Sequence, residues 1–174
     1  KWGESQKTSE GKPWPEVESV KGKRNWYALP KREPGLLLLP MVTGESLRCI
    51  VNACNAQVDH NLFEVISEDR DILNALGMYL NSAMIFLGRE LIGRVNLGDG
   101  ALKVEGIDWE RILVPDKKLL SRVKRHAGKA FEKICKRSIK DIRTEAKRND
   151  RLDFERGVLK SLGLPEEMAK KILD

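Results

Sequence analysis

Two different spacings of hydrophobic residues divide this chain. Between residues 26 and 67, short apolar runs alternate with turns, which predicts strands at 26–31, 36–42, 47–53 and 62–67. The run LLLLPMV at 36–42 has no polar alternation, so we expect that strand to be buried on both faces. After residue 69 the apolar residues recur every three or four positions, which predicts helices. A further short strand is expected at 101–104.

The first expected helix begins at an acidic cap, either Asp69 or Asp71, and continues to about Leu87. Gly88 and Gly93 weaken its end, because glycine is a poor helix former. This helix carries the Asn81-Ser82 step inside an otherwise apolar sequence.

The second expected helix is longer, and Asp116 is placed to cap it. It runs from residue 117 to about residue 148. Two short helices then close the chain, separated at Gly163 and restarted at Pro165. The apolar seam of the long helix comprises Leu120, Val123, Ala127, Ala130, Phe131, Ile134, Ile139 and Ile142.

These elements predict an α+β fold: a small mixed β-sheet packed with a helix, followed by a long basic helix and a short C-terminal helical tail. Residues 1–25 are rich in Lys, Glu, Gly, Ser and Pro, and we interpret them as a linker or interdomain loop. Residues 26–116 form the expected α+β domain, and residues 117–174 the helical region. The sequence opens KWGESQK without methionine, so we expect more chain before Lys1.

The net positive charge of the chain indicates which class of partner it binds. The net charge is +6, and nearly all of the excess lies between residues 117 and 151. This distribution favours a polyanion, with nucleic acid ahead of membrane. The longest apolar stretch, 35–42, is too short to cross a bilayer. Three cysteines and the lack of an apolar signal segment predict a reducing, cytoplasmic location.

Candidate catalytic and metal chemistry is weak in this chain. Cys49, Cys54 and His60 lack the fourth ligand and tight pair of a zinc site, and a buried free thiol explains Cys49. Asp99 and Glu105 flank Lys103 too loosely for a magnesium nuclease. We therefore assign no metal site and no catalytic residue. His126 is interpreted as a solvated helical histidine without a role.

An ordered set of short motifs extends from residue 26 to residue 116. It comprises Trp26-Tyr27, the apolar run 36–40, Asn52, Leu80-Asn81-Ser82, Gly98 and Gly100, and Leu113-Val114-Pro115. The set resembles the C-terminal target-recognition region of adenine-N6 DNA methyltransferases of restriction-modification type, although 112–115 departs from the paired-proline phrase of that family. Asn81, Ser82, Gly98 and Gly100 are the marker positions of this resemblance.

The resemblance implies a fragment that reads double-stranded DNA for a catalytic domain or subunit N-terminal to Lys1. That domain would use S-adenosylmethionine to methylate a flipped adenine. This chain has no Pro-Pro catalytic loop and no glycine-rich loop after a strand, so it holds no cofactor and performs no methyl transfer alone. The parent protein would be an adenine-specific DNA methyltransferase.

The DNA-binding candidates lie at strand ends and turns, where side chains reach furthest. An Arg can pair with guanine and an Asn with adenine, while Lys and Arg bind phosphates. For each candidate the alternative is a solvated surface charge, and for Asn81 and Ser82 it is close packing of a helix. The candidates are Lys23, Arg24, Lys31, Arg32, Arg48, Arg94, Asn96 and Lys103.

The long helix supports two interpretations. Its basic residues could lie along a DNA backbone, or they could be the solvated outer face of a packed helix. Its seam also offers a surface for oligomerisation. Two rival functions remain at this stage: a stand-alone DNA-binding specificity module, and an unspecific basic protein that binds nucleic acid, RNA included.

Overall fold

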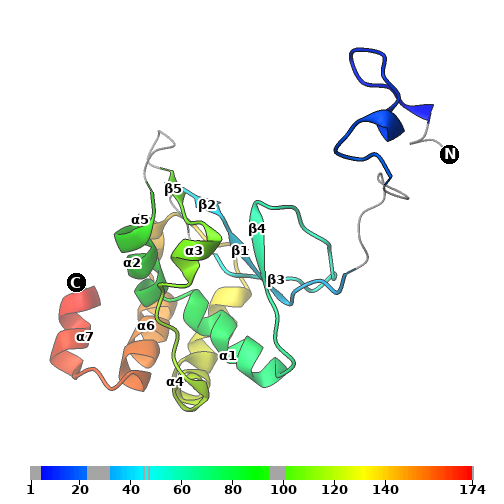
Figure 1. Cartoon of the computed structure of the whole chain (residues 1–174). Helices are drawn as coiled ribbons and strands as arrows, with labels where there is room; N and C mark the ends of the chain where they lie inside the picture. Colours follow the sequence, from blue (N-terminus) through cyan, green and yellow to red (C-terminus); the bar gives the residue numbers. More distant parts are fainter. Residues whose placement is uncertain (1–4, 23–31, 45, 47, 95–100, 174) are drawn as a thin grey trace. The chain divides into compact units, whose positions relative to one another are not determined.

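The computed structural model describes residues 5–22, 32–44, 46, 48–94 and 101–173 (Figure 1). By its internal contacts the chain divides into two units, Lys1–Glu33 and Pro34–Asp174. In the first unit an antiparallel bridge joins Lys7 to Pro13, and a 3₁₀ turn, η2 (Trp14–Glu16), follows. The strand predicted at 26–31 lies outside the described residues.

The second unit contains two small sheets. In the larger one, β1 (Leu37–Pro40) is the central strand, with β3 (Ile50–Val51) on one side and β4 (Leu62–Val65) on the other. The smaller sheet pairs β2 (Val42–Thr43) with β5 (Leu102–Lys103). Every strand pair in the described part of the chain is antiparallel, where the sequence suggested a mixed sheet. Between β1 and β3 the short connection, residues 41–49, favours this pairing, because a parallel crossover needs a dozen or more residues.

The strand predicted at 36–42 is divided between these two sheets. Residues 37–39 are buried, as their unbroken hydrophobicity predicts. Pro40 has no N–H to donate to a ladder. The Met41 N–H donates instead to the Asn61 carbonyl at 2.8 Å, and the chain enters the second sheet at Val42.

The single helix expected after Asp69 is two helices, α1 (Arg70–Leu80) and α2 (Ala83–Ile92). Asp69 caps α1 as predicted, because its Oδ1 accepts from the backbone N–H groups of residues 71 and 72 at 3.0 and 3.1 Å. The break falls at Asn81 and Ser82, and Ser82 has an extended backbone with φ −86° and ψ 161°.

A short helix, α3 (Gly106–Trp109), leads into α4 (Lys117–Cys135). Asp116 caps α4 as predicted, accepting from the Leu119 N–H at 2.8 Å. However, α4 ends at Cys135 and not near residue 148. A separate turn of helix, α5 (Ile142–Glu145), follows, and Asp141 caps it through the Thr144 N–H.

The chain closes with α6 (Asn149–Ser161) and α7 (Glu166–Leu173), the two short helices that the sequence predicts. Gly163 lies between them with φ +80°, a left-handed conformation that glycine adopts without strain. The fold class is therefore α+β, with a long helix and a C-terminal helical tail, as expected from the sequence.

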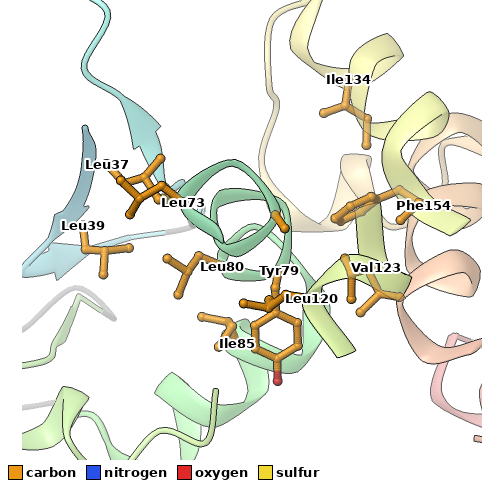
Figure 2. Packing of buried hydrophobic residues seen from close by; sticks show 14 residues of the cluster. Leu37, Leu39, Leu73, Tyr79, Leu80, Ile85, Leu120, Val123, Ile134 and Phe154 are labelled. Atoms are coloured by element: carbon orange, nitrogen blue, oxygen red, sulfur yellow. The ribbon is translucent and has the colours of Figure 1, made fainter. Parts of the chain in front are cut away.

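The hydrophobic core joins the larger sheet to the helices. Figure 2 shows Leu37 and Leu39 of β1 directed toward Leu73 and Leu80 of α1. The helical part of the core lies where α4 packs against α1 and α6. The predicted seam is confirmed over the length of α4, where Leu120, Val123, Ala127 and Ile134 are buried and Ala130 and Phe131 are partly buried. Ile139 and Ile142, its last two predicted members, lie beyond the end of α4. Phe154 of α6 is fully buried in the same cluster.

The backbones of α4 and α6 come unusually close at Gly157. A Cβ atom added there would lie 2.7 Å from the His126 carbonyl oxygen and 2.9 Å from the Ala127 Cα. Real Cβ atoms do not approach backbone so closely, so any larger residue at position 157 would force the two helices apart. Ala127, itself fully buried, provides the matching small surface on α4.

We predict that Gly157→Ala destabilises the protein. Alanine normally gains about 1 kcal/mol over glycine inside a helix. Overlap with the α4 backbone should outweigh that gain, for a net loss of about 1–3 kcal/mol in the free energy of unfolding. Urea denaturation followed by circular dichroism would measure it.

Gly128→Ala is the matched control, because Gly128 is also a buried helical glycine but a Cβ there meets only the Met78 Cε, at 4.0 Å. The control should be neutral or more stable than the parent. Equal behaviour of the two variants would show that the helices do not cross as closely as described.

Candidate nucleic-acid interface

One side of α4 carries a row of basic residues opposite its buried seam. At 100° per residue, these residues lie within one quadrant of the helix, turned away from Val123 and Ala127. All are exposed except Arg122, which is half-buried. The row extends roughly 27 Å at 1.5 Å rise per residue. We call this set the basic face; it comprises Lys118, Arg122, Arg125, Lys129, Lys133 and Lys136.

The basic face has no carboxylate partner within the described residues. Arg122 donates to the Lys160 carbonyl at 3.5 Å, and the Arg125 Nε donates to the His126 Nε2 at 3.3 Å. No ion pair is formed by any member of the set in this part of the chain. The charges are therefore available to an external anion.

The basic residues on the neighbouring flank of α4 differ. Lys117 pairs with Asp69 at 2.8 Å, and Lys124 pairs with Asp71 at 3.1 Å. These contacts join α4 to the start of α1. The pairing raises the pKa of Lys117 and lowers the pKa of Asp69. On α4, the lysines that face α1 are thus neutralised by aspartates, whereas the residues of the basic face are not.

Arg137, just beyond α4, is neutralised by two carboxylates. Its guanidinium binds both oxygens of Glu145, at 2.7 and 2.8 Å, and both oxygens of Asp150, at 2.6 and 3.1 Å. Such fork-shaped pairs are the strongest ion pairs that arginine forms. They lower the pKa of Glu145, and lower that of Asp150 to about 2. The charge of Arg137, just after the end of α4, is therefore neutralised within the protein and is not part of the basic face.

Two predicted DNA contacts, Arg94 and Lys103, lie side by side. Their backbones form an antiparallel bridge, with N–H to carbonyl distances of 2.9 and 3.0 Å in the two directions. Both side chains pair with Glu105, at 2.9 and 2.8 Å, and Arg94 also reaches Asp108 at 3.2 Å. Hydrogen bonds and these cations lower the pKa of both carboxyls. The side chains of Arg94 and Lys103 are therefore already paired with carboxylates of the protein, and a ligand would have to compete with those pairs.

Two other predicted positions are among the described residues. Arg48 donates to the Ile139 carbonyl at 3.1 Å, and Arg32 is exposed in the first unit. Several predicted positions lie outside the described residues: Lys23, Arg24, Lys31, Asn96, Gly98 and Gly100.

The marker pair Asn81 and Ser82 forms a structural junction. The Asn81 amide accepts from the Cys49 N–H at 3.0 Å and donates to the Cys49 carbonyl at 3.1 Å, so it pairs with that residue like a neighbouring strand. The Ser82 hydroxyl is fully buried and donates to the Tyr79 carbonyl at 2.7 Å. Both side chains are thus engaged within the protein.

Because the Ser82 hydroxyl is engaged, a distant carboxylate caps α2. Glu155 of α6 accepts the Ala83 N–H at 2.9 and 3.0 Å through its two oxygens, and Arg151 binds the same carboxylate at 2.9 Å. Arg151 also donates to the Asn81 carbonyl at 2.6 Å. Burial raises the pKa of Glu155, and Arg151 and the Ala83 N–H oppose that shift. No local pattern in the sequence predicts this cap, because the two partners are 72 residues apart.

The described residues offer little further chemistry. Cys49 is a buried free thiol, as expected, and burial raises its pKa to about 12. In the described residues, no group of His, Cys, Asp and Glu side chains is arranged to hold a metal ion. Likewise, none of the described helices is long and apolar enough to span a membrane.

Comparison with known proteins adds no further identification. No protein-family model matches the chain, and no curated protein or solved structure matches it. The arrangement of charges is thus the main observation that bears on function.

We predict that Asp150 makes the protein acid-sensitive. Its folded-state pKa of about 2 lies below the ordinary 3.8, so its contribution to stability is complete above pH 3.8 and is lost as pH falls toward 2. Asp150→Asn should remove about 2 kcal/mol from the free energy of unfolding at pH 7 and flatten its decline between pH 4 and 2. Thermal or urea unfolding across this range would measure the effect.

Asp153→Asn, on the same helix, is the control. Asp153 pairs with Arg156 at 3.4 Å across an exposed surface, and such pairs contribute less than about 1 kcal/mol. If both variants lose the same stability, the Arg137 network is no stronger than a surface pair.

Proposed function

We propose that this protein binds double-stranded DNA, with the basic face of α4 lying along the phosphate backbone. The observation that carries the proposal is the separation of charges on one helix: the flank facing α1 is paired with aspartates, while the members of the basic face form no ion pair with any described residue. A row of about 27 Å spans several phosphates of one strand, since phosphates repeat every few ångströms along DNA. Such contacts position a protein without reading sequence.

The resemblance in the sequence extends the proposal to a specific role. We infer that the chain is the target-recognition part of an adenine-N6 DNA methyltransferase, with S-adenosylmethionine bound by a catalytic domain outside this chain. The bridge between Arg94 and Lys103 supports this view, because the ion pairs of both residues with Glu105 reinforce it. Asn96 is the candidate for contact with a base.

Binding should depend steeply on salt and on the basic face. Neutralising Lys129 and Lys133 as Lys129→Gln/Lys133→Gln removes two phosphate contacts. The affinity for a duplex at moderate salt should fall about tenfold or more, and the slope of log K against log salt should become shallower by about 1.8. Fluorescence anisotropy with a labelled duplex at several salt concentrations would measure both quantities.

The control is Lys117→Gln/Lys124→Gln, which removes the same charge from the same helix on its paired flank. This variant should keep most of the salt dependence. Equal losses in the two double variants would mean that net charge alone drives binding. Absence of duplex binding by the parent protein at low salt would refute the proposed function.

The recognition role makes a separate prediction. Selection of duplexes from a random pool should enrich a short motif that contains adenine, and that motif should carry N6-methyladenine in the genome of the organism that encodes the protein. Enrichment without methylation would favour a stand-alone specificity module. Equal affinity for random DNA and RNA would favour the unspecific alternative.

A further inference from the structure

His126 lies at the close crossing of α4 and α6, between the basic face and the end of α6. Its Nε2 accepts a hydrogen bond from the Arg125 Nε at 3.3 Å, and its Nδ1 lies 3.3 Å from the Ser161 Oγ. Gly157 makes this position available, because the missing side chain lets α6 approach the His126 backbone. From the sequence alone, no role is predicted for His126.

The hydrogen bonds define which imidazole nitrogen carries the proton. The Ser161 hydroxyl is fully buried and donates to the Gly157 carbonyl at 2.7 Å, so its oxygen can only accept from His126. Nδ1 is then the protonated nitrogen. Nε2 holds a lone pair, which is what the Arg125 N–H requires. His126 is thus neutral while this chain of hydrogen bonds is intact.

Three cations act electrostatically on this neutral imidazole. Arg122 and Arg125 lie on α4, and Arg122 donates to the backbone carbonyl of Lys160, the third cation, at the end of α6. Burial first, and then the charges of Arg125, Lys160 and Arg122, lower the pKa of His126. No carboxylate is among the groups that act on it. On α1, which packs on the other flank of α4, the aspartates 69 and 71 are occupied by Lys117 and Lys124.

We propose that Arg122, Arg125, His126 and Lys160 form one phosphate subsite, and that His126 gains a proton when a backbone phosphate of DNA binds there. The inference rests on the proposed function and names one of its contacts. Like charges repel when gathered without a counter-ion, and a phosphate between them converts that repulsion into attraction.

Protonation of Nε2 would also end its role as an acceptor for Arg125. The guanidinium is then released toward the phosphate, and the imidazolium donates a further charge-assisted hydrogen bond. Because the phosphate favours the charged imidazole, the protonated protein must bind DNA more tightly by the same factor that DNA favours protonation. Binding should strengthen as the pH falls.

The experiment uses the fact that the chain has two histidines. Duplex affinity is measured by anisotropy at pH 8.0 and 5.5 for the parent protein, for His126→Gln and for His60→Gln, in which the exposed His60 is replaced. For each protein, the gain in duplex affinity between pH 8.0 and pH 5.5 is calculated. This gain should be about three- to tenfold larger for the parent and for His60→Gln than for His126→Gln. Thermal unfolding of each variant verifies its fold.

A second measurement needs no variant at this site. The two imidazole C2–H signals are followed by proton NMR during a pH titration, with His60→Gln giving the assignment. The His126 signal should titrate at higher pH when a duplex is bound than when it is absent. Inorganic phosphate, added alone, should shift His126 in the same direction only if the subsite accepts any phosphate.

The outcomes separate the two proposals. Salt-dependent duplex binding without any change in the His126 titration, and with identical pH responses in all three proteins, overturns the subsite and leaves the proposed function intact. Absence of duplex binding by the parent overturns both. A shift of His126 with phosphate but not with DNA shows an anion site unconnected with the backbone, and also overturns the inference.

Discussion

The close contact of α4 and α6 at Gly157 is the constraint on which the rest of the structure depends. It allows a helix crossing with little side-chain bulk between the two backbones. Because α4 is held by that contact and by its seam, its opposite side must face solvent, and every basic residue on that side is exposed or half-buried. The same contact places Ser161 and Lys160 beside His126. Packing thus determines the direction in which the charges point.

Local chemistry made part of the fold predictable. The caps Asp69 and Asp116, the stop at Gly163 and the restart after Pro165 all act within a few residues, and all are confirmed. The α4 seam is confirmed for the same reason, because a helical period is visible in any window of two or three turns. The buried free thiol of Cys49 follows from its apolar surroundings.

The remainder could not be predicted, because its causes lie far apart along the chain. The break after α1 involves the pairing of Asn81 with Cys49 and the capping of Ala83 by Glu155. The end of α4 involves Arg137 with carboxylates on two later helices. For the candidate interface, the sequence shows how many basic residues exist but not which have partners. Arg94 and Lys103 looked available and are paired, whereas Lys129 and Lys133 have no carboxylate among the described residues.

The carboxylate of Glu155 also determines which part of the chain can fold by itself. It caps a helix that begins 72 residues earlier, and its partner Arg151 holds the carbonyl at the preceding break. A fragment that ended at Asp116 would leave the first N–H of α2 without its acceptor and the core without the side chains of α4 and α6. A fragment that is meant to fold as this unit does would therefore have to include the C-terminal helices α4 and α6.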